Sequence, residues 1–154
     1  PGRCFFCRCG NRYLGTHRII FSEGALMSFV LGKRSLARLE GVHPDLVAVV
    51  KRAIEITPQD FAVLEGLRTK ERQAQLVQAG ASKTLASRHL TGHAVDLGVL
   101  VDGVVKWDWP LYDQLAKTMK AAAAELHLSI EWGGDWKTFK DGPHFQLPKQ
   151  TYPA

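Results

Sequence analysis

The chain has 154 residues, 45% of them hydrophobic and 23% charged, a composition that indicates one globular domain and excludes a disordered, collagen-like or multidomain protein. Its formal net charge of +5 favours an anionic partner such as nucleic acid, lipid headgroups or cell-wall polymer without selecting among them. No apolar run reaches the roughly 20 residues of a membrane-spanning helix, and the N-terminus lacks the pattern of a secretory signal. We therefore expect the product to stay in the compartment where it is made.

Residues 1–26 differ from the rest, and we expect them to be a leader that is disordered or non-native, followed by one domain over residues 27–154. The leader has a net charge of +3, which leaves +2 for the domain. Because all three cysteines, Cys4, Cys7 and Cys9, lie in it, no disulfide framework can hold the domain together. The alternative is a structural zinc bound by these cysteines and His17, although only one C-x-x-C half-site is present.

The first half of the domain predicts two helices and a strand. Apolar residues recur at helical spacing over residues 44–56, where Pro44 and Asp45 suit the first turn. Residues 61–64 are typical of a buried strand, and a helix is expected over residues 69–79, ended by Gly80.

The second half predicts a hairpin, a long helix and two short strands. Asp102-Gly103 is the dipeptide of a type I′ turn, because both of its central residues need positive φ, and residues 94–99 and 104–107 flank it as strands. Alanine-rich residues 110–126 favour the longest helix, and residues 130–132 and 144–147 are candidate strands. The order predicts an α+β domain with a small antiparallel sheet flanked by about three helices.

Two histidines and an aspartate near the first hairpin strand suggest a metal site. His89 and Asp96 are seven positions apart, so a straight strand would direct them to opposite faces. Thr91-Gly92 can supply the bend that brings them together. His144, after the turn-prone Asp141-Gly142-Pro143, is the candidate third ligand, and a His₂Asp set with one open position suits catalytic zinc.

Other assignments of the histidines stay open at this point. His93 could replace His89, or both could bind from one helix at i and i+4, as in the zincin motif, although Thr91-Gly92 disfavours a helix there. We expect His17, His43 and His127 to be structural, with His43 in local capping before Pro44.

The stretch Ser87 to Asp96 resembles the metal-binding signature of the zinc D-Ala-D-Ala peptidase superfamily, Ser-x-His-x-x-Gly-x-x-x-Asp, which is followed downstream by an acid-x-x-His as in Asp141 to His144. The resemblance is closest to phage endolysins of the L-alanyl-D-glutamate endopeptidase type and covers nearly all of 27–154. Further matching segments are Met27-Ser28-Phe29, Gly41-Val42-His43-Pro44, Glu65-Gly66-Leu67-Arg68-Thr69, Trp132-Gly133-Gly134-Asp135-Trp136 and Asp141 to Gln146. The leader has no counterpart in the family pattern.

This resemblance implies a zinc D,D-peptidase or hedgehog-like fold and a role for each matched residue. It implies one Zn²⁺ per chain bound by His89, Asp96 and His144, with Asp141 as catalytic acid and Arg68 as the group that meets the oxyanion. His93 falls at a variable position and is expected beside the site. Ser87 and Gln73 match positions near the substrate, and Trp132, Asp135 and Trp136 are expected either to wall the cleft or to belong to the core.

The implied substrate is the stem peptide of bacterial peptidoglycan, cut between L-Ala and D-Glu or, alternatively, at a terminal D-Ala. The expected protein is a monomer that inserts into no membrane and waits in the host bacterium's cytoplasm until another protein permeabilises the inner membrane. A noncatalytic zinc-containing wall-binding module would lack the acid, so Asp141 argues against it. A nucleic-acid binder is disfavoured, because the domain shows no clustered Lys and Arg stripe.

Overall fold

Four α-helices and five short strands make up residues 28–153, the part of the chain that this computed structural model describes. The elements are α1 (Lys33–Arg38), α2 (Pro44–Ile56), β1 (Phe61–Glu65), α3 (Lys70–Gln78), the 3₁₀-helix η1 (Arg88–Thr91), β2 (Ala94–Val101), β3 (Val104–Lys106), α4 (Trp109–Glu125), β4 (Glu131–Trp132), the 3₁₀-helix η2 (Gly133–Asp135) and β5 (His144–Gln146). The α+β class is confirmed. The short α1 is the helix that the sequence did not predict, and the predicted leader, with its cysteines and His17, lies outside the described residues.

The strands form one antiparallel sheet in the order β1-β2-β5-β4, and β3 pairs with the far half of β2 on the same edge as β5. The predicted turn closes the β2–β3 hairpin, with φ of 52° at Asp102 and 75° at Gly103. Asp96 in the central strand β2 lies opposite Glu65 of β1 and opposite His144 of β5. Three polar residues from three strands therefore meet across the middle of the sheet.

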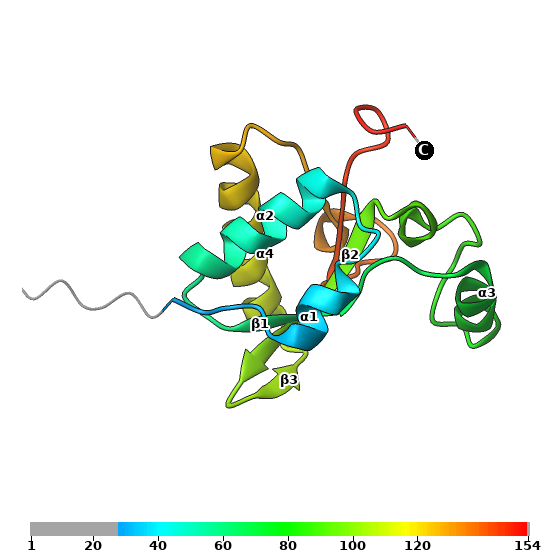
Figure 1. The fold of residues 1–154 in the computed structure, drawn as a ribbon. Helices are drawn as coiled ribbons and strands as arrows, with labels where there is room; N and C mark the ends of the chain where they lie inside the picture. The colour runs from blue at the N-terminus through cyan, green and yellow to red at the C-terminus, as the bar shows by residue number, and fades with distance from the viewer. Residues whose placement is uncertain (1–27, 154) are drawn as a thin grey trace, which may run out of the picture.

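The apolar core lies between one face of this sheet and the helices α2 and α4, which pack together beside it (Figure 1). Val95, Leu97 and Val99 of β2 are fully buried in that core. Because side chains alternate along a strand, Asp96 points to the opposite face. The core thus fixes which residues of β2 remain free to form a site.

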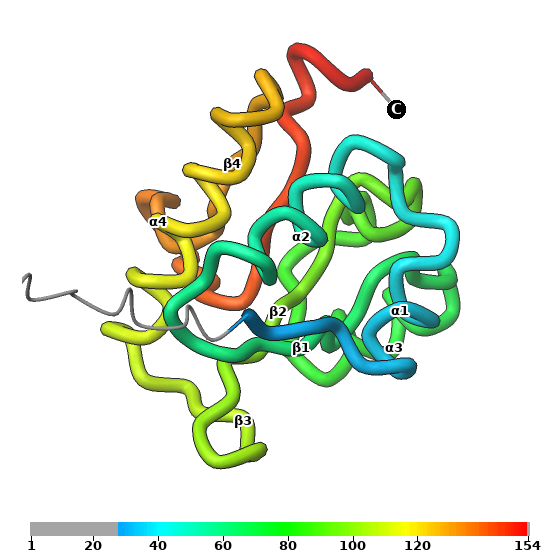
Figure 2. The backbone as a smooth tube through the Cα atoms, turned by 60° about the vertical axis from the view of Figure 1, so that its left-hand side comes forward, coloured from blue at the N-terminus to red at the C-terminus, as the bar shows by residue number. Residues whose placement is uncertain are grey.

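Helix α3 stands apart from the α2–α4 pair, on the other side of the molecule in both Figure 1 and Figure 2. The loop after α3 leads into η1, which returns the chain to β2. The polar face of the sheet is thus bordered by α3 and its loop rather than by the long helices. Within residues 28–153, no helix has the length and apolarity needed to cross a membrane.

Candidate metal centre

A bend after η1 delivers His89 to the polar face of the sheet. The hydroxyl oxygen of Ser87 accepts a hydrogen bond from the His89 amide at the start of η1, and Gly92 ends it with φ of 71°. A Cβ at Gly92 would also collide with the carbonyl oxygen of Gly41. Glycine is therefore required both for the positive φ and for the close approach of the two backbones. The bend lies where the sequence placed it, and His89 and His93 do not share a helix.

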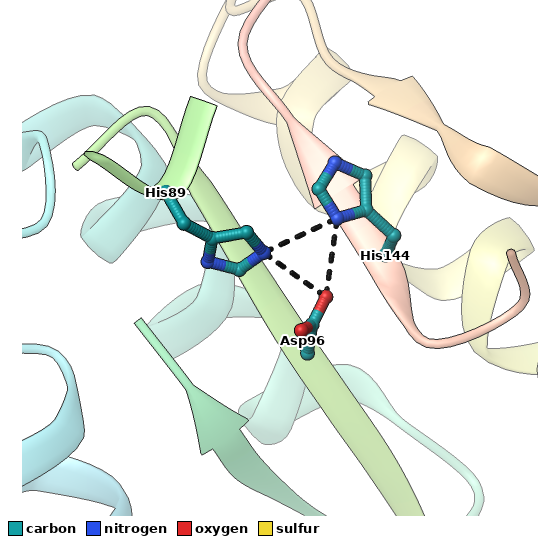
Figure 3. Close-up of side chains that lie close together, drawn as sticks. All are labelled: His89, Asp96 and His144. Carbon is teal, nitrogen blue, oxygen red and sulfur yellow. Dashed lines mark hydrogen bonds and ion pairs between the residues drawn. The ribbon is translucent and has the colours of Figure 1, made fainter. Parts of the chain in front are cut away.

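Three donor atoms from η1, β2 and β5 converge on one point (Figure 3). His89 Nε2 lies 3.2 Å from Asp96 Oδ1, His144 Nδ1 lies 3.1 Å from the same oxygen, and the two nitrogens are 3.3 Å apart. Within residues 28–153, this is the one group of three or more such side chains close enough to share an ion.

In each of the two histidines, the ring nitrogen that faces away from Asp96 forms a hydrogen bond to another group. This bond leaves a lone pair on the nitrogen that faces Asp96. His89 Nδ1 lies 2.7 Å from the carbonyl oxygen of Gly66, which can only accept, so this nitrogen carries the hydrogen. His144 Nε2 lies 3.0 Å from Gln146 Oε1 and donates to it in the same way. In their neutral forms, both rings therefore present an unprotonated nitrogen to Asp96.

The donor set fits a zinc ion. Three acceptor atoms facing one another at 3.1–3.3 Å need a proton or a cation between them. Zinc bound tetrahedrally at about 2.0–2.1 Å places neighbouring ligand atoms about 3.3 Å apart. The observed separations match that spacing.

The charges of the site act on its acidic groups in opposite directions. Burial raises the pKa of Asp96, but the rings of His144 and His89, which donate to it and carry positive charge when protonated, outweigh that effect and hold the pKa well below its usual range. Burial and then the charge of Asp96 raise the pKa of Asp141. Asp96 therefore stays ionised, while Asp141 is the carboxyl group disposed to take up a proton.

Asp141, three residues before β5, is held in place by the backbone around it. Its amide donates to the carbonyl oxygen of Gly133 at 3.0 Å, and a Cβ at Gly133 would press against the Cβ atoms of Asp141 and His144. The close approach of η2 thus fixes where the turn 141–143 lies. Asp141 lines the same cavity as His89 and His144.

Arg68 holds one oxygen of Asp96 and is itself held by its neighbours. Its guanidinium donates to Asp96 Oδ2 at 3.2 Å, to Glu65 Oε2 at 2.5 Å and to Gln73 Oε1 at 2.7 Å, and the side chain is 7% exposed. With Oδ2 engaged, Oδ1 faces the histidines. Glu65 was missed by sequence reasoning; its position opposite Asp96 depends on the pairing of β1 with β2.

Gln146 and Glu131 are the other residues that sequence reasoning missed. Glu131 Oε2 accepts from Gln146 Nε2 at 2.6 Å, which turns the amide so that Oε1 faces His144. The only signal in the sequence is the spacing of two between His144 and Gln146, which places both side chains on one face of a strand.

The cavity has a volume of about 810 Å³ and contains the candidate centre in its wall. Of the residues expected near the substrate, Ser87 and Trp136 line it. Gln73 is 1% exposed and connects Arg68 to the loop after α3 through Ser82 and the carbonyl of Thr84.

Trp132 and Asp135 lie outside the cavity lining. The Trp132 indole is buried, stacks on Phe145 and donates to the carbonyl oxygen of Gly142 at 2.7 Å. Asp135 is exposed and pairs with Lys120 at 2.7 Å. Trp132 packs in the core because β4 pairs with β5 and aligns it with Phe145.

The remaining described histidines stand away from the three donor atoms. His43 caps α2 by accepting from the Asp45 amide at 3.2 Å, as its place before Pro44 suggested. His93 Nδ1 lies 2.9 Å from the Thr91 hydroxyl, and its ring packs on His43 at 5.1 Å between centroids. His127 follows the end of α4 with φ of 56°.

Comparisons with known proteins agree on one family. A family model described as phage L-alanyl-D-glutamate peptidase matches residues 27–147. The L-alanyl-D-glutamate peptidase of Escherichia phage T5 is 34% identical over 130 residues, which cover 82% of this chain and 94% of the relative. That of Listeria phage A118 is 36% identical over 122 residues, or 77% of this chain, but the match spans 42% of that longer relative.

Solved structures give the same result for the fold. The Serratia marcescens L-Ala D-Glu endopeptidase superposes with a TM-score of 0.77 at 49% identity, over 85% of this chain and 98% of that one. A vancomycin-resistance D,D-dipeptidase in complex with a phosphinate analogue of D-Ala-D-Ala has a TM-score of 0.51 at 19% identity, over 69% of this chain and 50% of that one. The latter supports the fold alone.

Proposed function

The chain belongs to the phage L-alanyl-D-glutamate peptidase family, and we propose that it is a zinc-dependent endopeptidase that hydrolyses the bond between L-Ala and D-Glu in the stem peptide of bacterial peptidoglycan. The observation that carries the proposal is the convergence of His89, Asp96 and His144 in the wall of a cavity that Asp141 also lines. Peptide hydrolysis needs an activated water and a proton carrier, and this arrangement can supply both.

In this proposal His89, Asp96 and His144 would hold a single zinc ion through the three facing atoms Nε2, Oδ1 and Nδ1. When bound, such an ion would supply the Lewis acidity that makes a water molecule nucleophilic at neutral pH. Two neutral imidazoles and one carboxylate leave the centre with a formal charge of +1. Gly66 and Gln146 hold the rings in the orientation that binding requires.

Asp141 carries the proton. As a carboxylate it takes a proton from the attacking water, and as an acid it gives that proton to the nitrogen of the departing D-Glu. Its burial and the nearby charge of Asp96 raise its pKa, which improves it as a base and suits the return of the proton. A noncatalytic wall-binding module would not need an acid–base group such as Asp141 beside the metal ligands.

Arg68 has two roles in the proposed mechanism. It fixes Asp96 through Oδ2, and its permanent positive charge faces the cavity, where it can stabilise the oxyanion that forms from the scissile carbonyl. In this mechanism Gln73 accepts a hydrogen bond from Arg68 and positions it, rather than contacting the substrate. Ser87 and Trp136 line the cavity and are the proposed contacts of the stem peptide.

We further propose that the protein acts on the cell wall as a monomeric endolysin, made in the cytoplasm of an infected bacterium and released when another protein permeabilises the inner membrane. The membership in a phage family and the basic net charge of +5 support this role, because the stem peptide carries several carboxylates.

The test is digestion of purified peptidoglycan with the zinc-loaded full chain, with and without a chelator, followed by mass spectrometry of the new termini. New amino termini at D-Glu that vanish with the chelator are the expected result. Release of terminal D-Ala instead would assign the protein as a carboxypeptidase, and binding to the wall without cleavage would favour a noncatalytic module.

A further inference from the structure

Four cationic side chains line the cavity, and two of them are engaged by other groups of the protein. Arg68 binds Glu65 and Asp96, and the buried Arg88 donates to the carbonyl oxygens of Leu147 and Tyr152 at 3.0 and 2.9 Å. Lys83 and Lys149 also line the cavity, and neither forms an ion pair within residues 28–153. Among the described residues, these two lysines therefore keep their full charge for an anionic group of the substrate, whereas the charge of Arg68 is shared with two carboxylates.

Lys83 contacts the loop that carries Asp141. Its ammonium sits 5.7 Å from the centre of the Phe139 ring, and both residues line the cavity. Phe139 precedes Asp141 by two residues, whereas Lys83 belongs to the loop between α3 and η1. The contact thus joins two loops from different parts of the chain and ties a positive charge to the segment that carries the proposed proton carrier.

Lys149 lies beyond the end of β5, the strand that Asp141 precedes. It follows β5 by three residues, whereas Asp141 precedes β5 by the same number. Through its contact with Phe139, Lys83 is therefore linked to the segment that enters β5, whereas Lys149 belongs to the segment that leaves it. This arrangement distinguishes the two lysines by position although their chemistry is the same.

In the proposed reaction, the leaving group of the substrate, which receives the proton from Asp141, carries a negative charge. When the bond between L-Ala and D-Glu is cut, the leaving group is the amine of D-Glu. Glutamate has two carboxyl groups, and whichever one continues the peptide, the other is a free carboxylate in the same residue as that amine. A carboxylate that enters beside Asp141 and Asp96 is repelled unless a cation accompanies it.

We infer that Lys83 recognises the free carboxylate of the D-Glu residue and makes the enzyme selective for stems in which this group is ionised rather than amidated. The inference rests on the proposed function. Lysine suits the task, because its flexible four-carbon stem lets the ammonium leave the Phe139 ring and reach a carboxylate with any of three donors. Lys83 thereby becomes a determinant of specificity on the leaving-group side.

The experiment compares two soluble stem peptides that differ only in whether D-Glu carries a free carboxylate or a carboxamide. With zinc-loaded full chain, the wild type should show a kcat/KM about tenfold higher for the carboxylate, the size expected for one hydrogen bond to a charged group. Lys83→Met should bring the two values of kcat/KM to within about twofold of each other. Lys83→Arg should retain the preference, because it keeps the charge.

Lys149→Met is the matched control, since it removes the same kind of side chain from the segment that follows β5, away from the Phe139 loop in sequence, and it should leave the preference unchanged. An equal loss on both substrates in Lys83→Met, or a loss of preference in Lys149→Met alone, would overturn the inference while leaving the endopeptidase intact. If the wild type cleaves neither peptide between L-Ala and D-Glu, the proposed function fails and the inference fails with it. Circular dichroism and zinc content confirm that the variants are comparable.

Discussion

His144 donates from Nε2 to the side-chain oxygen of Gln146, two residues further along β5, at 3.0 Å. This hydrogen bond sets the tautomer of the ring, so that Nδ1 is the nitrogen that faces Asp96 and His89. Glu131 keeps the amide of Gln146 in the required orientation. The candidate metal centre is thus supported by a chain of contacts that extends to β4.

Gln146→Leu should weaken zinc binding by about 10- to 100-fold, the usual effect of removing the partner of a metal-ligating histidine. The reason is that His144 loses the acceptor that selects its tautomer and orientation. Competition with a chromophoric chelator measures the affinity. Gln150→Leu, at an exposed position beyond the strand, is the control, and equal affinities in the two variants would remove the role assigned to Gln146.

His89→Ala and His93→Ala separate the candidate ligand from its neighbour. We expect His89→Ala to lose both zinc and lytic activity, because it removes one of three convergent donors. His93→Ala should retain the metal, since His93 contacts Thr91 and His43 instead. Elemental analysis of dialysed protein decides between them, and the reverse outcome would replace His89 by His93 in the ligand set.

Asp141→Asn should give a folded, zinc-loaded protein whose rate is lower by about 10²- to 10⁴-fold, the contribution typical of a general acid–base group. The amide keeps the size of the side chain but can no longer carry the proton. The measurement is the turnover of a stem peptide at matched zinc content. Asp135→Asn removes an exposed carboxylate paired with Lys120 and should turn over nearly as the wild type does; undiminished turnover in Asp141→Asn would exclude the proton carrier.

Gly92→Ala and Gly103→Ala test the bend that positions His89. Both glycines have positive φ, so each substitution should cost about 1–2 kcal/mol for the backbone conformation alone. At Gly92 the new Cβ also meets the carbonyl of Gly41, whereas Gly103 has open space, so Gly92→Ala should cost about 1–3 kcal/mol more. Urea unfolding measures the free energy of unfolding of each variant. Equal losses in Gly92→Ala and Gly103→Ala would mean that the backbone around Gly41 moves away from the new Cβ without an energetic penalty.

The local elements were predictable from sequence because each depends on neighbours in the chain. The helix over 44–56 follows from apolar spacing and Pro44, and the β2–β3 turn follows from the need of Asp102-Gly103 for positive φ. The bend at Gly92 was predictable for the same reason. The short α1 was not, because its six residues provide too few turns for a periodic pattern.

What the sequence determined by itself was the α+β class, the family resemblance and the candidate set His89, Asp96, His144, Asp141 and Arg68. Only the tertiary structure decided that Glu65 and Gln146 support this set, that Trp132 lies in the core, and that Lys83 and Lys149 line one cavity. The physical reason is that these contacts form between strands and loops far apart in the chain. The register of the sheet determines which residues meet across neighbouring strands. The spacing of residues within one segment of the sequence does not specify that register.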